Sequence, residues 1–239
     1  MVREVRIKSE SFAEVRRKVV NEACEAKRRR VCEASGGRFG YLDIAKMDNA
    51  SYVQFEKDMF AEGYGKDGLV IDVRDNPGGR IADALLNILC RPEHGITMRR
   101  GGSRPGYPAW LMRSPVWRNP VVVLCNEESG SNSEIFSHAI KVLKRGRLVG
   151  QPTGGAVIWT RPVKLLDVGE FRMPFSGAFL LDGTDTEGHG AVPDVLVDED
   201  LNAATKGVDV QLEAAIRVLD EDVRKFKSAR KPVKLKYMR

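Results

Sequence analysis

The stretch that most constrains the fold is an apolar run that changes abruptly into a helix pattern. Residues 120–125 (PVVVLC) are rich in β-branched side chains, which is typical of a strand covered on both faces. From Ile135 onward, apolar residues recur at helical spacing. Because only a short segment separates the two patterns, the sequence predicts a strand-to-helix turn with Ser131 near the N-terminus of the helix.

A serine in this position has two interpretations. The unpaired amides and the positive end of the dipole at a helix N-terminus favour a developing negative charge, as acyl transfer requires. Ser131 is therefore a candidate nucleophile. Ser129, Ser131 and Asn132 are also typical helix-capping and turn residues. Taken alone, this segment favours capping.

The same order of strand, turn and helix occurs earlier in the chain. Residues 69–73 form a buried-strand pattern, residues 76–79 (NPGG) form a turn that needs glycine torsions, and residues 82–89 continue as an apolar helix. Glycines in such a turn let a backbone N–H approach a substrate atom closely. A tight loop without a ligand fits the turn equally well.

The remaining elements follow from similar patterns. Residues 182–190 form a loop that contains Glu187 and His189, two side chains capable of acid–base chemistry. A surface excursion is expected over residues 91–119, which are rich in Pro, Gly and Arg. Further strands are predicted at 2–7, 39–44, 147–150, 163–168, 170–175 and 178–181, with a hairpin turn at 167–169, and further helices at 12–35, 51–60 and 208–226.

Composition limits the classes of function. A chain of 239 residues with 42% hydrophobic content can bury a full core. The net charge of +6 is concentrated at residues 28–30 and 225–239, which favours solvated basic ends over a nucleic-acid surface. The four cysteines form no C-x-x-C pair and are expected to be reduced thiols. We expect a cytoplasmic protein without a membrane segment, metal or cofactor.

Four motifs in a fixed order carry a resemblance to a known family: residues 73–79 (VRDNPGG), 129–135 (SGSNSEI), 149–153 (VGQPT) and 190–194 (GAVPD). Together they resemble the catalytic domain of the tail-specific (C-terminal-processing) serine peptidases over residues 36–220. Residues 40–47, with Asn126 and residues 135–137, resemble the tricorn-like branch. The resemblance implies an α/β fold with crotonase-like stacking of strand–strand–helix units.

The resemblance also assigns roles to residues. It places the nucleophile on Ser131 and the oxyanion-hole amides on Asn132 and Gly79. The tail-specific branch activates its serine with a lysine twenty-five positions later, where this chain has Ala156. The tricorn-like branch uses a histidine and a serine upstream of a PDZ domain, together with a glutamate that Glu187 matches.

The resemblance further implies domain boundaries. Residues 1–36 are expected to be the end of a missing PDZ-like domain plus a connecting helix, residues 37–226 the catalytic domain, and residues 227–239 a basic tail. The histidine-bearing segment would then be missing. His94 lies in the excursion, and His138 lies about two turns beyond Ser131. His189 is a candidate base, with a plain turn or surface histidine as the alternative.

Two functions of different class are compatible with the sequence. The first is a serine-type peptidase domain that hydrolyses peptides through an acyl-enzyme on Ser131 and needs an upstream histidine-bearing segment, supplied in trans or by a longer chain. The second is a truncated, non-catalytic relative that binds peptides or assembles with partners. A homo-oligomer is expected. A nucleic-acid-binding module ranks last because the basic ends lack aromatic interleaving.

Overall fold

The computed structural model describes residues 9–92, 95 and 116–230. The strand predicted at 2–7, most of the excursion at 91–119, His94 and the end of the basic tail lie outside the described residues. Within the described part, no helix is long and apolar enough to cross a lipid bilayer.

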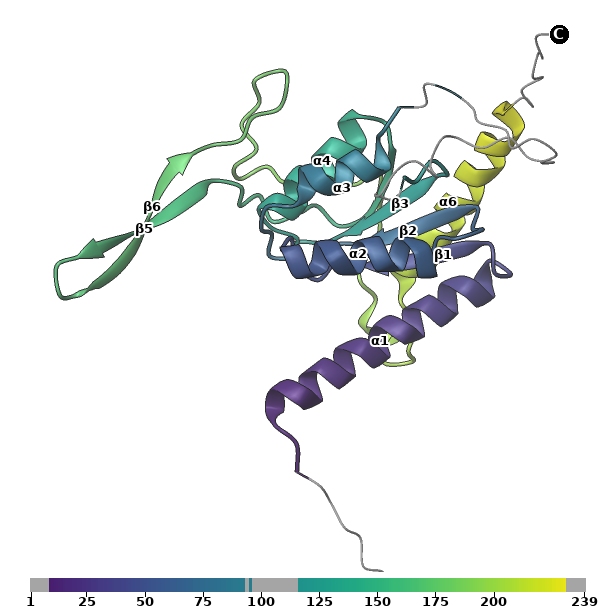
Figure 1. Cartoon of the computed structure of the whole chain (residues 1–239), viewed down its shortest axis with the longest axis horizontal. Helices are drawn as coiled ribbons and strands as arrows, with labels where there is room; N and C mark the ends of the chain where they lie inside the picture. Colours follow the sequence, from purple (N-terminus) through teal and green to yellow (C-terminus); the bar gives the residue numbers. More distant parts are fainter. Residues whose placement is uncertain (1–8, 93–94, 96–115, 231–239) are drawn as a thin grey trace, which may run out of the picture.

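A parallel sheet of five strands forms the centre of the molecule (Figure 1). The strands are β1 (Phe39–Asp43), β2 (Gly68–Asp72), β3 (Val121–Cys125), β4 (Gly146–Gly150) and β7 (Val195–Leu196), in that spatial order. Every residue of β2 and β3 is buried. The apolar runs that predicted β2 and β3 therefore form interior strands of the sheet, as expected for parallel strands covered on both faces.

Helices cover both faces of this sheet (Figure 1). One face carries α2 (Asn49–Ala61), α3 (Ala82–Leu89) and α4 (Asn132–Val142), and the other carries α1 (Phe12–Ala34) and α6 (Val210–Ala229), which the short α5 (Leu201–Ala204) precedes. Successive strand residues point to opposite faces, so Ile71 packs with the first group and Val70 with the second. The result is a mixed α/β fold of three layers.

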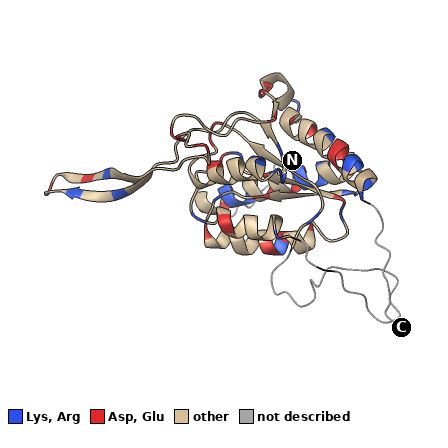
Figure 2. Ribbon diagram, turned by 90° about the horizontal axis from the view of Figure 1, so that it is seen from above, with Lys and Arg blue, Asp and Glu red and all other residues tan. Residues whose placement is uncertain are grey.

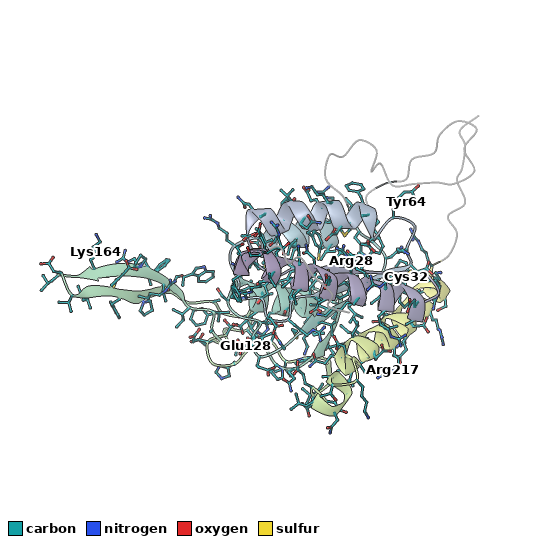
Figure 3. The ribbon with its side chains drawn as sticks, turned by 90° about the horizontal axis from the view of Figure 1, so that it is seen from below. Arg28, Cys32, Tyr64, Glu128, Lys164 and Arg217 are labelled. Carbon is teal, nitrogen blue, oxygen red and sulfur yellow. The ribbon has the colours of Figure 1, made fainter. Side chains whose placement is uncertain are left out.

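A two-stranded hairpin projects away from this body (Figures 1 and 2). It consists of β5 (Trp159–Leu165) and β6 (Gly169–Ser176), paired antiparallel. Its turn confirms the hairpin predicted around residues 167–169. Lys164 lies near its outer end (Figure 3).

Two details differ from what the sequence suggested. The strand predicted at 178–181 does not form, because the backbone turns back after Leu180: the Gly183 N–H donates to the Leu180 carbonyl at 2.9 Å. Only a single bridge, between Phe179 and Asp185, remains. The helix predicted at 12–35 forms as α1, but its first residue, Phe12, is 81% exposed, and Val31 is the buried residue of α1.

Candidate active site

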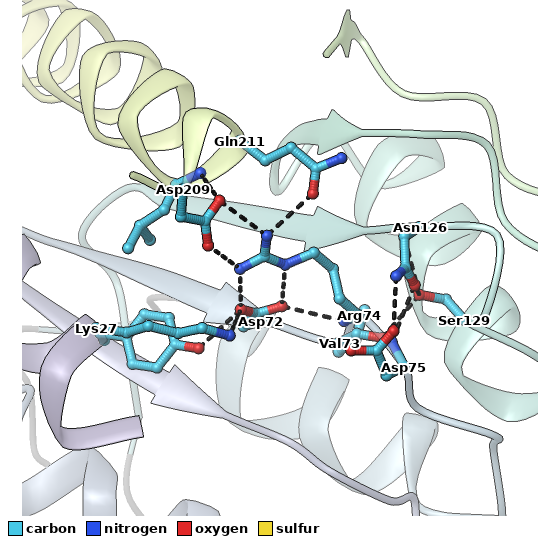
Figure 4. A network of polar contacts seen from close by, with 11 residues as sticks. Lys27, Asp72, Val73, Arg74, Asp75, Asn126, Ser129, Asp209 and Gln211 are labelled. Atoms are coloured by element: carbon cyan, nitrogen blue, oxygen red, sulfur yellow. Dashed lines mark hydrogen bonds and ion pairs between the residues drawn. The ribbon is translucent and has the colours of Figure 1, made fainter. Parts of the chain in front are cut away.

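The two predicted turns meet at one edge of the sheet. Strands β2 and β3 are parallel neighbours, so the turns that follow them begin side by side. The Gly130 N–H donates to the Asn76 carbonyl oxygen at 2.9 Å. The side chain of Asn126 accepts the Asp75 N–H at 2.9 Å and donates to the Asp75 carboxylate at 2.8 Å (Figure 4). These hydrogen bonds join the turn after β2 (residues 74–79, the glycine turn) and the turn after β3 (residues 126–132, the serine turn) into one unit.

Ser131 lies where the sequence predicted, directly before α4. Its φ of 53° and ψ of −120° depart from the extended conformation that N-cap residues usually have, and a positive φ in a residue other than glycine stores strain. Its N–H donates to the Glu134 carboxylate at 2.8 Å and to the Ala156 carbonyl at 3.0 Å. Its hydroxyl donates to no other described residue. The surroundings therefore hold the backbone of Ser131 and leave its hydroxyl proton without an acceptor in the described part of the chain.

The two amides predicted for an oxyanion hole belong to these adjoining turns. Among the described residues, neither the Asn132 N–H nor the Gly79 N–H donates a hydrogen bond. Gly78 brings the turns together, because a Cβ added to it would lie 2.6 Å from the Ser131 Cβ and 2.9 Å from the Asn132 nitrogen. The Gly78 N–H itself is bound to the Asn76 side chain at 2.8 Å. Both amides predicted for the oxyanion hole are therefore free of described acceptors.

Asn132 also has a structural role. Its side-chain oxygen accepts the Ala82 N–H at 2.9 Å, at the first residue of α3. The N-cap residue of that helix is Ile81, which has no polar side chain to cap it. The serine turn thus caps the helix that follows the glycine turn.

Glu187 contacts the segment that also contacts Ser131. Its Oε2 accepts the N–H groups of Val157 at 2.7 Å and Ile158 at 2.9 Å. These residues follow Ala156, whose carbonyl accepts the Ser131 N–H. Glu187 and Ser131 therefore flank residues 156–158.

Two histidines, His138 and His189, lie in the described part of the chain. The exposed ring of His189 lies with its Nδ1 2.8 Å from the main-chain oxygen of Glu187, so the ring donates to the backbone and not to the carboxylate. His138 is half-buried on α4, and burial lowers its pKa. Within the described residues, no histidine is hydrogen-bonded to the Ser131 hydroxyl, and no group of three or more His, Cys, Asp or Glu side chains could hold a metal ion.

Sequence reasoning missed Glu134, which is fully buried. Its carboxylate accepts four hydrogen bonds: from the Ser131 N–H at 2.8 Å, the Thr153 hydroxyl at 2.7 Å, the Gly155 N–H at 2.6 Å and the Ala156 N–H at 2.8 Å. A glutamate three residues after a capping serine is the signature of a capping box, and this spacing could have drawn attention to it. No local sequence pattern predicts that its other three donors come from residues 153–156.

A second polar network fixes the start of the glycine turn (Figure 4). Arg74 donates to Asp72 at the end of β2 and to Asp209 before α6, at 2.7 and 2.8 Å. Asp72 also accepts from the Tyr41 hydroxyl at 2.7 Å and from Lys27 of α1 at 3.3 Å. Burial would raise the pKa of Asp72, but the Arg74 and Lys27 charges hold it well below its usual range.

Residues 38–197 match the model described as Peptidase family S41. This match covers more than half of the chain, so the chain belongs to peptidase family S41. Membership in this family implies a serine peptidase domain, and it confirms the resemblance that the four motifs indicated.

Particular relatives agree with this assignment. The chain is 32% identical over 205 residues to the tricorn protease of Thermoplasma volcanium, covering 85% of this chain and 19% of that protein. It is 37% identical over 188 residues to the tricorn protease homolog 1 of Streptomyces coelicolor, covering 78% of this chain and 17% of that protein. A carboxyl-terminal-processing protease of Synechocystis is 28% identical over 191 residues, covering 77% of this chain and 44% of that protein.

Solved structures share the fold. A crystal structure of the tricorn protease superposes with a TM-score of 0.74 at 29% identity, over 84% of this chain and 19% of that one. The photosystem II D1 C-terminal processing protease superposes with a TM-score of 0.53 at 25% identity, over 77% of this chain and 47% of that one. The chain spans about a fifth of the length of the tricorn relatives.

Proposed function

We propose that this chain is the catalytic domain of a peptidase that cleaves peptides through an acyl-enzyme on Ser131. The observation that carries the proposal is the arrangement at the serine turn. A hydroxyl on a strained backbone stands at a helix N-terminus, beside the free amides of Asn132 and Gly79. Oriented amides at such a point stabilise the negative charge that develops during acyl transfer.

The reaction would follow from these groups. The Ser131 oxygen attacks the carbonyl carbon of the peptide and passes its proton to a base. The carbonyl oxygen becomes an oxyanion that accepts the N–H groups of Asn132 and Gly79. The base then protonates the leaving amine as the C–N bond breaks, and water releases the acyl group by the same steps.

The base is proposed to be a histidine from a segment outside these 239 residues, supplied in trans or by a longer chain. Glu187 would orient it: Oε2 is bound to two backbone amides, whereas Oε1 accepts no hydrogen bond from a described residue and could receive an imidazole N–H. A lysine is not available at Ala156. His189 is the candidate base within this chain, and its exposed ring leaves Nε2 accessible.

A second function is favoured by one observation. Because the Ser131 hydroxyl donates to no described residue, a non-catalytic relative that binds peptides or assembles with partners also fits. In either case we propose peptide ligands and a homo-oligomer.

Other parts of the proposal rest on the resemblance and on composition. They are the crotonase-like stacking of strand–strand–helix units, an end of a PDZ-like domain over residues 1–36, a catalytic domain over residues 37–226 and a basic tail over residues 227–239. A cytoplasmic location, without a nucleic-acid or membrane partner, is proposed as well.

The test is covalent labelling by a serine-directed fluorophosphonate, together with a peptidase assay. The chain is assayed alone, with His189→Ala, and with an upstream segment from a complete relative. Ser131→Ala is expected to abolish labelling while the fold persists, and Ser137→Ala on the same helix is the control. If Ser131 is only a cap, its replacement costs about 1 kcal/mol of unfolding free energy and labelling is unchanged.

The outcomes separate the alternatives. Peptidase activity that requires the added segment supports the histidine in trans. Activity of the chain alone that disappears with His189→Ala would make His189 the base. Labelling that persists in Ser131→Ala would refute the nucleophile.

A further inference from the structure

Glu134 is a buried carboxylate that no cation among the described residues neutralises. Its exposed fraction is 0%, and within the described part of the chain no Lys or Arg forms an ion pair with it. A buried charge without a counter-ion is costly unless hydrogen bonds satisfy it. Here four donors surround the two carboxylate oxygens. An ordinary helix cap does not require such an environment.

The four donors come from two separate segments. One is the Ser131 N–H, and the other three are on Thr153, Gly155 and Ala156. The Thr153 hydroxyl in turn accepts the Ala191 N–H at 2.6 Å. Glu134 therefore ties the serine turn to the segment that leads to the amides held by Glu187.

A charged carboxylate suits this position better than a neutral amide. All four partners are donors, and a carboxylate is an acceptor at both oxygens. Glutamine has the same shape but only one acceptor oxygen, so its NH₂ group would face N–H or O–H donors. Glu134→Gln is therefore a conservative change in volume that removes half of the acceptors.

We propose that Glu134 is a positioning residue of the active site, which holds the backbone of Ser131 in its strained conformation and fixes residues 153–156 against it. The inference rests on the proposed function. The N–H of Ser131 is bound to Glu134 and Ala156 and therefore cannot donate to a substrate in the oxyanion hole. The amides of Asn132 and Gly79, which donate to no described residue, are the donors proposed for the oxyanion hole.

The expected effect on reactivity is large. A misplacement of a reacting group by about 1 Å can lower a rate by about 100-fold. We expect Glu134→Gln to lower the fluorophosphonate labelling rate of Ser131 by about 100-fold per folded molecule. A purely structural glutamate would change the folded fraction and leave the rate per folded molecule unchanged.

The experiment compares the wild-type chain with Glu134→Gln and with Glu128→Gln, a control at an exposed position of the preceding turn (Figure 3). Circular dichroism gives the folded fraction, labelling gives the rate, and amide hydrogen exchange by NMR reports on Ser131, Gly155 and Ala156. In Glu134→Gln we expect a slower labelling rate and loss of protection at these three amides. Glu128→Gln is expected to match the wild type.

The inference is overturned if folded Glu134→Gln is labelled at the wild-type rate, or if the three amides keep their protection. If the wild-type chain is not labelled even with the upstream segment added, the proposed function fails, and the exchange data still decide whether Glu134 holds the turn. Should Glu134→Gln not fold, Thr153→Val removes one of the four donors instead. The Thr153→Val variant is then expected to show a decrease in the labelling rate and in amide protection, each smaller than the decrease expected for Glu134→Gln. A Thr153→Val variant without these decreases would overturn the inference.

Discussion

Replacement of Gly78 by alanine tests the close contact between the two turns. Gly78 has a φ of +96°, and an added Cβ would lie 2.6 Å from the Ser131 Cβ, 2.8 Å from the Gly130 oxygen and 2.9 Å from the Asn132 nitrogen. Backbone strain at such a φ costs about 1–3 kcal/mol. Overpacking costs about 1–3 kcal/mol more. The expected loss of unfolding free energy is therefore about 2–6 kcal/mol.

Gly65→Ala is the matched control. Gly65 has a φ of +73°, but nothing lies within 4 Å of an added Cβ. The unfolding free energy of Gly65→Ala should therefore fall only by the cost of backbone strain, without the cost of overpacking. Urea unfolding at constant pH gives both free energies. Because the clash separates the turns that carry Ser131 and the Asn132 amide, Gly78→Ala should also slow the labelling of Ser131. Equal losses in the two variants, or a Gly78→Ala chain labelled at the wild-type rate, would refute the contact.

Three further predictions concern other parts of the molecule. Glu187→Ala removes the acceptor of two backbone amides, those of Val157 and Ile158. It should lower the unfolding free energy by about 1–3 kcal/mol and speed the hydrogen exchange of both amides. Exchange rates equal to those of the wild type would contradict this prediction. Burial, together with the neighbouring Asp72, raises the pKa of Asp43 to about 6 from 3.8. Folding therefore binds a proton between about pH 4 and 6, and the stability falls as the pH rises through this window. Asp43→Asn should stabilise the protein at pH 8 by up to about 3 kcal/mol and by much less near pH 4, as urea unfolding at the two pH values would show. Replacing β5 and β6 by a short linker should leave the thermal unfolding of the remaining body nearly unchanged, because the hairpin projects away from the core (Figure 1); a large fall in the unfolding temperature would show that it supports the body.

Much of the fold could be predicted from local sequence patterns. The β-branched runs before both turns predicted β2 and β3, two interior strands of the sheet, and the helices that follow them were predicted from apolar spacing. The glycine turn was predicted because left-handed torsions, such as the φ of +96° at Gly78, favour glycine. The hairpin turn near Gly169 was predicted from its residues. These features depend on residues close together in the chain, so the sequence alone determined them.

The residues that complete the site were decided by the tertiary structure. The four donors to Glu134 lie on both sides of the crossover of about twenty residues that contains α4 and β4. No local sequence pattern predicts them. Likewise, the carboxylate of Glu187 binds the amides of Val157 and Ile158 instead of the ring of His189, two residues away. Periodicity reports which face of an element is buried, whereas the partner of a buried carboxylate depends on which strand ends the parallel sheet brings together. The sequence by itself therefore determined where Ser131 stands, and only the folded chain decided what holds it there.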